Sequence, residues 1–183
     1  MKKRQAIAVG QVLLAALAAV WVGRAAFAQS TALTVPQSIR LEHAVIIERL
    51  TKEAVRPGPT GVVAQKALIL IVDHFAREEQ FVFPPLGLLD EIAEGKLPDD
   101  ATKQLAIKMA ERTKASKDRL HEDHVQITSL MNELRESATK VRELDLVAFA
   151  SSVAAHNLSE AEVMEPAAIV IGDYLRSKLP PGR

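Results

Sequence analysis

Residues 149–174 have the sequence FASSVAAHNLSEAEVMEPAAIVIGDY, and one set of side chains in this stretch recurs at alternating spacings of four and three. The set begins at Phe149, passes through His156 and Glu160, and ends at Tyr174. Because an α-helix turns once every 3.6 residues, these side chains fall on one face. The stretch therefore predicts a long amphipathic helix whose inner face carries a histidine and a glutamate among apolar residues.

Three further segments show the same periodicity, and clusters of proline and glycine separate them. We expect one continuous helix in each of the ranges 36–54, 62–81, 100–140 and 145–178, with a short helical piece at 86–94. Short or moderate connections between long amphipathic helices make consecutive helices antiparallel neighbours. The sequence thus predicts an all-α fold, an up-down-up-down four-helix bundle over residues 36–178.

The composition excludes several classes of site. The chain has 183 residues, with 23 basic and 23 acidic side chains and no cysteine. Without cysteine there are no disulfides, no thiolate catalysis, no iron–sulfur cluster and no covalently attached c-type haem. The balanced charge gives no basis for nucleic-acid binding. No glycine-rich phosphate-binding motif is present either.

The first 28 residues have the three parts of a secretory signal peptide. A basic start at 1–4 precedes a mostly apolar run at 6–22, and Ala26-Phe27-Ala28 forms a cleavage site of small residues. We expect cleavage after Ala28 and a periplasmic or secreted protein. The alternative is an uncleaved membrane anchor, since the apolar run is at the short limit for spanning a bilayer. Contact with a membrane is expected through this segment alone.

Each predicted helix carries at least one histidine on its apolar face. The five histidines are His43, His74, His121, His124 and His156. A lone histidine on such a face is usually a hydrogen-bonded core residue. Five imidazoles packed together without metal would bring many polar nitrogens that need partners. A metal ion satisfies one nitrogen on each ring, so the pattern favours a metal centre.

Two glutamates strengthen the case for metal. His74 and Glu78 are four residues apart, and so are His156 and Glu160. Side chains four apart stack on one helix face, so each pair can present an imidazole and a carboxylate to the same interior point. We expect the second and fourth helices to face each other with these matching pairs.

This donor set suits two octahedral metal ions with room for a small external ligand. Imidazole nitrogen with carboxylate oxygen favours iron over calcium or magnesium, and manganese and zinc also fit. Two neighbouring glutamates, Glu79 and Glu165, fall off the inner face by helical angle. We therefore expect both of them in solvent.

Together these motifs resemble the hemerythrin-like domain of the HHE cation-binding type, in a bacterial branch. His43 matches the ligand of the first helix and His124 that of the third. Residues 74–89 resemble the motif of the second helix, and 156–175 that of the fourth. The resemblance covers about residues 37–176, and it implies a non-haem di-iron site between four helices.

The chain departs from the oxygen-carrying hemerythrins at two points. Those proteins space two histidines of the third helix four apart, whereas His121 and His124 are three apart. They also end with an aspartate five residues after the last histidine, whereas here Glu160 comes four after it and Ala161 occupies the fifth place. Reversible O2 binding therefore does not carry over directly. His121 is either a fifth imidazole ligand or a hydrogen-bond partner of a ligand.

The leading functional hypothesis is an exported protein that binds two iron ions, with O2, NO or a related small molecule as its ligand. A second hypothesis is a di-iron redox enzyme that acts on peroxide or NO, although acid–base groups beyond the ligands are not evident. A third is a metal-free helical interaction module with structural histidines. Metal analysis separates the third hypothesis from the others, and turnover assays separate the first two.

Overall fold

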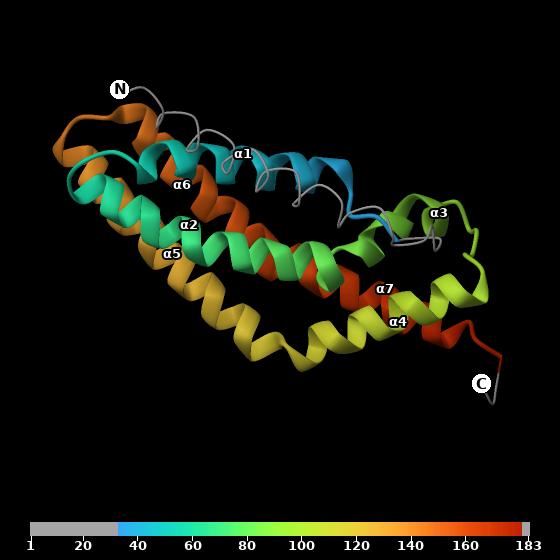
Figure 1. Cartoon of the computed structure of the whole chain (residues 1–183). Helices are drawn as coiled ribbons and strands as arrows, with labels where there is room; N and C mark the ends of the chain where they lie inside the picture. The colour runs from blue at the N-terminus through green and yellow to red at the C-terminus, as the bar shows by residue number, and fades with distance from the viewer. Residues whose placement is uncertain (1–32, 181–183) are drawn as a thin grey trace, which may run out of the picture. The chain divides into compact units, whose positions relative to one another are not determined.

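The computed structural model describes residues 33–180, and this part of the chain is all-helical with no strand. The elements are α1 (Gln37–Ala54), α2 (Pro59–Arg77), the π-helical η2 (Glu78–Val82), the 3-10-helical η3 (Pro84–Leu88), α3 (Leu89–Ala93), α4 (Asp100–Ala115), α5 (Lys117–Lys140), α6 (Leu144–Ser159), the π-helical η4 (Glu160–Met164) and α7 (Glu165–Ser177). The all-α prediction is confirmed (Figure 1). The predicted signal peptide lies outside the described residues.

No helix within residues 33–180 has the length and apolar character needed to cross a membrane.

Proline, glycine and aspartate set the helix starts. Pro36 precedes the first residue of α1, and Pro59 is the first residue of α2, where the missing N–H costs nothing. Gly58 has a φ of 94°, a left-handed conformation that suits glycine at the turn before α2. At α4, the carboxylate of Asp99 accepts a hydrogen bond of 2.8 Å from the backbone N–H of Thr102. Proline, glycine and a capping aspartate in the sequence therefore mark the starts of α1, α2 and α4.

The prediction of one continuous helix over 100–140 is wrong. The helix breaks at Ser116, whose φ of −99° and ψ of 3° lie outside the helical region, and Figure 1 shows the bend between α4 and α5. The two halves pack against different partners: α4 lies against α7, and α5 lies against α6 and α2. The bend therefore lets one long helical segment follow two neighbours.

Two apolar clusters form the core. Along the long helices, a layer of polar residues separates the members of one cluster from those of the other. On α1, His43 lies between Ile39 of one cluster and Ile46 of the other. On α5, His124 lies between Leu120 and Ile127 in the same way. Packed apolar side chains on both sides exclude water from this layer. Polar groups in it need partners within the protein.

The two π-helical segments shift the buried face of their helices. A π-turn holds one more residue than an α-turn, so the residues that follow it rotate relative to a regular helix. Val163 and Val170 belong to the set of side chains that runs from Phe149 to Tyr174 and was predicted to face inward. They are instead 62% and 64% exposed. Residues of α7 one or two positions later, including Glu165 and Ile171, are buried in their place.

Candidate metal centre

Six of the seven residues that we predicted as ligands meet in the polar layer. They come from α1, α2, η2, α5, α6 and η4. The six are His43, His74, Glu78, His124, His156 and Glu160. With Glu165 they form three overlapping groups that could each hold a metal ion, namely His43–His156–Glu160, His74–His124–Glu160 and Glu78–His124–Glu165. All of these residues except His156 are buried, and the His156 side chain is only 9% exposed.

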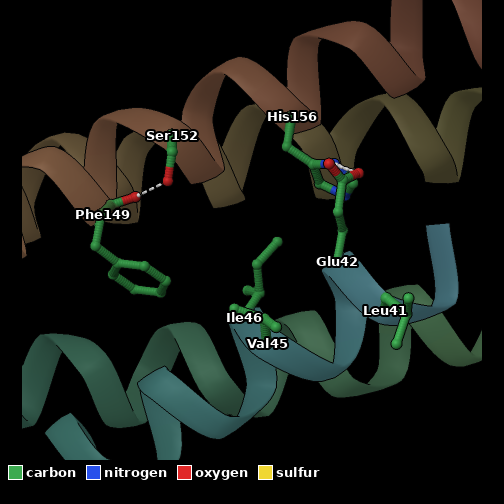
Figure 2. A pocket seen from close by; sticks show the side chains of 7 residues that line it. All are labelled: Leu41, Glu42, Val45, Ile46, Phe149, Ser152 and His156. Atoms are coloured by element: carbon green, nitrogen blue, oxygen red, sulfur yellow. Dashed lines mark hydrogen bonds and ion pairs between the residues drawn. The ribbon is translucent and has the colours of Figure 1, made fainter. Parts of the chain in front are cut away.

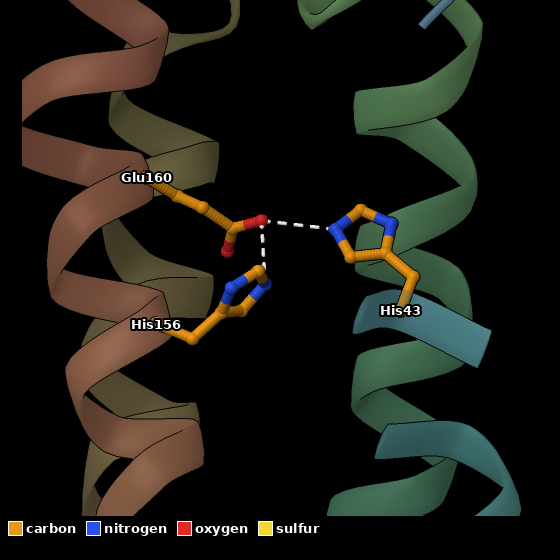
Figure 3. Close-up of side chains that lie close together, drawn as sticks. All are labelled: His43, His156 and Glu160. Atoms are coloured by element: carbon orange, nitrogen blue, oxygen red, sulfur yellow. Dashed lines mark hydrogen bonds and ion pairs between the residues drawn. The ribbon is translucent and has the colours of Figure 1, made fainter. Parts of the chain in front are cut away.

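One end of the centre consists of two histidines around one carboxylate oxygen (Figure 3). Glu160 Oε1 lies 2.9 Å from His43 Nε2 and 2.9 Å from His156 Nε2. The His156 and Glu160 side chains stack one turn apart, as their spacing predicts, and His43 reaches them from α1. Phe75 stacks on the His43 ring at a centroid distance of 3.7 Å and fixes its plane.

The other end contains two histidines and a carboxylate of its own. His74 and His124 pack edge to face, with ring centroids 4.6 Å apart. His124 Nε2 donates a hydrogen bond of 2.9 Å to Glu165 Oε1. This end thus has one more carboxylate than the end formed by His43 and His156.

Two glutamates connect these ends. Glu78 Oε1 lies 3.1 Å from His74 Nε2, whereas its Oε2 lies 3.8 Å from His43 Nε2. Glu160 likewise belongs to a candidate group at each end. A carboxylate can offer one oxygen to each of two ions, so both glutamates have the placement of bridging ligands.

The Nδ1 atoms of the four histidines all face an outer polar group, although that of His74 makes no hydrogen bond to it. The contacts are His43 with Glu79 at 2.8 Å, His74 with Asp123 at 3.5 Å, His124 with Asn157 at 2.6 Å and His156 with Glu42 at 3.2 Å. Metal-binding histidines typically direct one ring nitrogen to the ion and donate the other to a carboxylate or carbonyl. The rings of His43, His124 and His156 therefore have the orientation of ligands that bind through Nε2, and the His74 ring faces Asp123 at a longer distance.

Asp123 is the most deeply buried of these outer carboxylates, with a side chain 1% exposed. It pairs with Arg77 and, at 3.1 Å, with Arg119. Two arginines around one buried carboxylate offset its charge and fix its position. The negative charge of Asp123, 3.5 Å from His74 Nδ1, favours a proton on Nδ1, which is the tautomer that leaves Nε2 free for a metal.

We expect Asp123→Asn to weaken metal binding while the protein stays folded. The change removes the charge beside His74 but keeps the size of the side chain, and loss of such a partner typically costs about 10–100-fold in metal affinity. Competition with a chromophoric chelator measures the affinity. Asp118→Asn, a change at an exposed aspartate of the same helix, is the matched control. Equal affinities for the two variants would show that Asp123 does not position His74.

Several buried polar atoms of the cluster lack a hydrogen bond. They include Nε2 of His74, Nε2 of His156, both carboxylate oxygens of Glu78 and Oε2 of Glu160. Buried polar groups without partners are rare and each needs an explanation. Metal ions bound to Nε2 and carboxylate oxygen would give these atoms partners, so the donor set fits a metal.

Burial and neighbouring charges separate the pKa values of the histidines. Burial, followed by the nearby charge of His124, lowers the pKa of His74 to about 4. Burial also acts to lower the pKa of His124, but its hydrogen bonds to Glu165 and Asn157 outweigh this effect and raise it to about 9. At neutral pH the metal-free cluster therefore holds a neutral His74 beside a protonated His124.

The two central glutamates shift in opposite directions. Burial, with the charge of Glu160, raises the pKa of Glu78 well above its ordinary value. Burial also acts to raise the pKa of Glu160, but the His156 and His43 rings, whose Nε2 atoms are each 2.9 Å away, lower it overall. In the metal-free cluster, Glu78 therefore holds a proton more strongly than Glu160 does.

Metal binding is expected to release protons at neutral pH. His124 has a pKa of about 9 and must lose its Nε2 proton to bind an ion there. Affinity should rise between pH 6 and 8 by about tenfold per pH unit for each proton released. Calorimetry of zinc binding in buffers of different ionisation enthalpy counts these protons. A count of zero at pH 7 would contradict the protonation of His124 in the metal-free protein.

His121 does not join the cluster. Its side chain is exposed, and it belongs to none of the candidate groups in the described part of the chain. Three residues turn 300° along a helix, so His121 lies about 60° from His124 around α5. That angle carries it out of the polar layer, and the expectation that it contributes a ligand or contacts one is not met.

Glu165 lies in the site although the sequence does not predict it there, and the same is true of Asp123 and Asn157. We expected Glu165 in solvent, but it is buried and accepts a hydrogen bond from His124. Glu79 is exposed as expected, yet it contacts His43. A signal for Glu165 is present, because Pro84 and Pro166 each follow a His-x-x-x-Glu pair at the same distance. Each proline withholds a helical N–H, which favours the π-turn before it.

Comparisons of the chain with family models, with curated proteins and with solved structures found no match.

Proposed function

We propose that this chain is an exported, non-haem di-iron protein that binds a small molecule such as O2 or NO. One observation carries the proposal: two buried carboxylates with unpartnered oxygens lie between two sets of histidines whose Nε2 atoms point at them. A helical core without metal would gain nothing from this arrangement, since each unpartnered buried group is destabilising. The same layer gains partners when metal binds.

The proposed fold is a hemerythrin-like, up-down-up-down four-helix bundle. The order of the elements supports this fold. α4 and α5 follow each other around a single bend, and α6 continues through η4 into α7, so each of these sets forms one helical run. Together with α1 and α2 they make four helical runs; the connections are short except for segment 83–99, which contains η3 and α3. Each run supplies at least one side chain of the centre.

Two ions fit the donor set. His43 and His156 would hold one, and His74, His124 and Glu165 the other. Glu78 and Glu160 lie between these sets and would bind both ions. Imidazole with carboxylate suits iron, and manganese and zinc remain alternatives to be tested.

A pair of iron ions can exchange electrons with a small oxidant or bind it reversibly. The chain's own residues control access and protonation at the centre. The apolar clusters on both sides exclude water. Glu79, Asp123, Asn157 and Glu42 hold the ring nitrogens that face away from the centre. This arrangement favours ligand binding over catalytic turnover, because within residues 33–180 the acidic groups next to the histidines already serve as metal ligands or as partners of the rings, and none is left as a general acid or base.

Ligand titration against turnover tests the proposal. The protein, loaded anaerobically with ferrous iron, is titrated with NO and, separately, supplied with excess peroxide. A binding protein should show a saturable change in absorption with NO and no sustained peroxide consumption. Catalytic consumption of either molecule would support a di-iron redox enzyme instead. A protein that takes up no metal would support the metal-free interaction module.

A further inference from the structure

A groove between α1 and α6 adjoins the metal centre. Its volume is about 280 Å³. Figure 2 shows Phe149 at one end, the contact between Glu42 and His156 at the other, and Ile46 between them. His156 thus belongs both to the wall of the groove and to the proposed centre.

The polar groups of the groove are already satisfied. The Ser152 hydroxyl donates a hydrogen bond of 2.8 Å to the backbone carbonyl of Phe149. The Glu42 carboxylate lies 3.2 Å from His156 Nδ1. The groove therefore presents apolar surface, from Leu41 and Val45 among others, and few free groups to recognise a charged or hydrogen-bonding ligand.

We infer that this groove is a binding site for a small, uncharged, apolar molecule of the size of a dissolved gas. A closed apolar cavity of about 150 Å³ already accommodates xenon or benzene, so the space in this open groove, about 280 Å³, is large enough for such a molecule. Leu41 and Val45 are 56% and 62% exposed, so the groove is open to solvent and the molecule can enter directly. The molecule would lie against the His156 ring. Its role in supplying the centre rests on the proposed function, whereas binding in the groove does not.

Xenon is the probe for the site. The full chain, labelled at methyl groups and studied with and without zinc, is placed under increasing xenon pressure in an NMR experiment. We expect saturable shifts at the methyl groups of Leu41, Val45 and Ile46. Val45→Trp should fill the groove and abolish the shift at Ile46. Ile69→Trp, a change at another exposed apolar residue, should leave the shift intact.

Three results would overturn the inference. The first is the lack of a saturable shift, or an equal shift in Val45→Trp. The second is a concentration-dependent dimer that Val45→Trp dissociates, which would assign the groove to a second copy. The third is a shift that appears only after removal of residues 1–28, which would assign it to that segment.

A second measurement tests the link to the centre. In iron-loaded protein, Val45→Trp should slow the association of NO several-fold at unchanged iron content, and Ile69→Trp should not. If the protein binds no iron, the proposed function fails, yet the xenon experiment still decides whether the groove binds apolar molecules. If iron binds and both variants react at the wild-type rate, the groove does not supply the centre.

Discussion

Glu160→Gln is expected to remove most of the metal from the protein. Glu160 belongs to two of the three candidate groups and lies 2.9 Å from the Nε2 atoms of His43 and His156. Glutamine keeps the shape and an acceptor oxygen but loses the charge that offsets two cations. Since losing an outer partner costs about 10–100-fold in affinity, losing a shared ligand should cost more than ~100-fold. Elemental analysis after reconstitution measures the loss.

Glu162→Gln is the matched control, because Glu162 lies in the same π-turn and is exposed. Circular dichroism of both variants checks that the helices remain. Two metal ions per chain in the control and fewer than one in Glu160→Gln is the expected outcome. Full metal content in Glu160→Gln would show that this carboxylate is not a ligand.

His124→Ala is expected to cost at least one metal ion per chain, whereas His121→Ala should leave metal content and absorption unchanged. His124 belongs to two candidate groups, donates to Glu165 and is held by Asn157. His121 is exposed on the same helix and serves as the control. The metal-to-protein ratio and the charge-transfer absorption of the iron-loaded variants measure both effects.

The two variants also show which histidines of α5 bind the metal. Metal loss in His121→Ala equal to that in His124→Ala would mean that His121 turns inward when metal binds. The oxygen-carrier hypothesis would then gain support. Unchanged metal in both variants would exclude α5 from the site.

The inner faces of α1, α2 and α5 follow from the sequence, because these helices are regular where their ligands lie. Ile39, His43 and Leu50 on α1 are buried as the periodicity predicts, and so are Leu120 and Met131 on α5. Regular 3.6-residue geometry is the assumption behind such a prediction. It holds wherever the backbone hydrogen bonds keep the α pattern.

Glu165 escaped prediction because the helix is not regular after Glu160. The π-turn at Glu160–Met164 rotates the residues within it and after it relative to a regular helix. A face calculated from 3.6 residues per turn therefore places Val163 and Val170 inward, whereas both are exposed. Pro166 marks the irregularity, but proline alone does not specify whether a helix ends, kinks or forms a π-turn. The π-turn is selected by packing against the other helices, which a local sequence pattern does not reveal.

The break at Ser116 also escaped prediction because it depends on packing between helices. Nothing in the local sequence near Ser116 resembles a helix stop, since no glycine or proline lies between Pro98 and Gly172 other than Pro166. The partners of the two halves, α7 for α4 and α6 for α5, are separate elements of the chain. Local periodicity cannot reveal such a break.

The iron content of the protein and the magnetic state of that iron test the central claim most directly. The chain is reconstituted anaerobically with ferrous iron, oxidised, freed of loose metal and analysed for iron, with electron paramagnetic resonance on the same sample. We predict two ferric ions per chain that are magnetically coupled through shared carboxylates, and hence no resonance from isolated ferric ions. A colourless protein without iron, or iron with the full signal of isolated ions, would contradict the account.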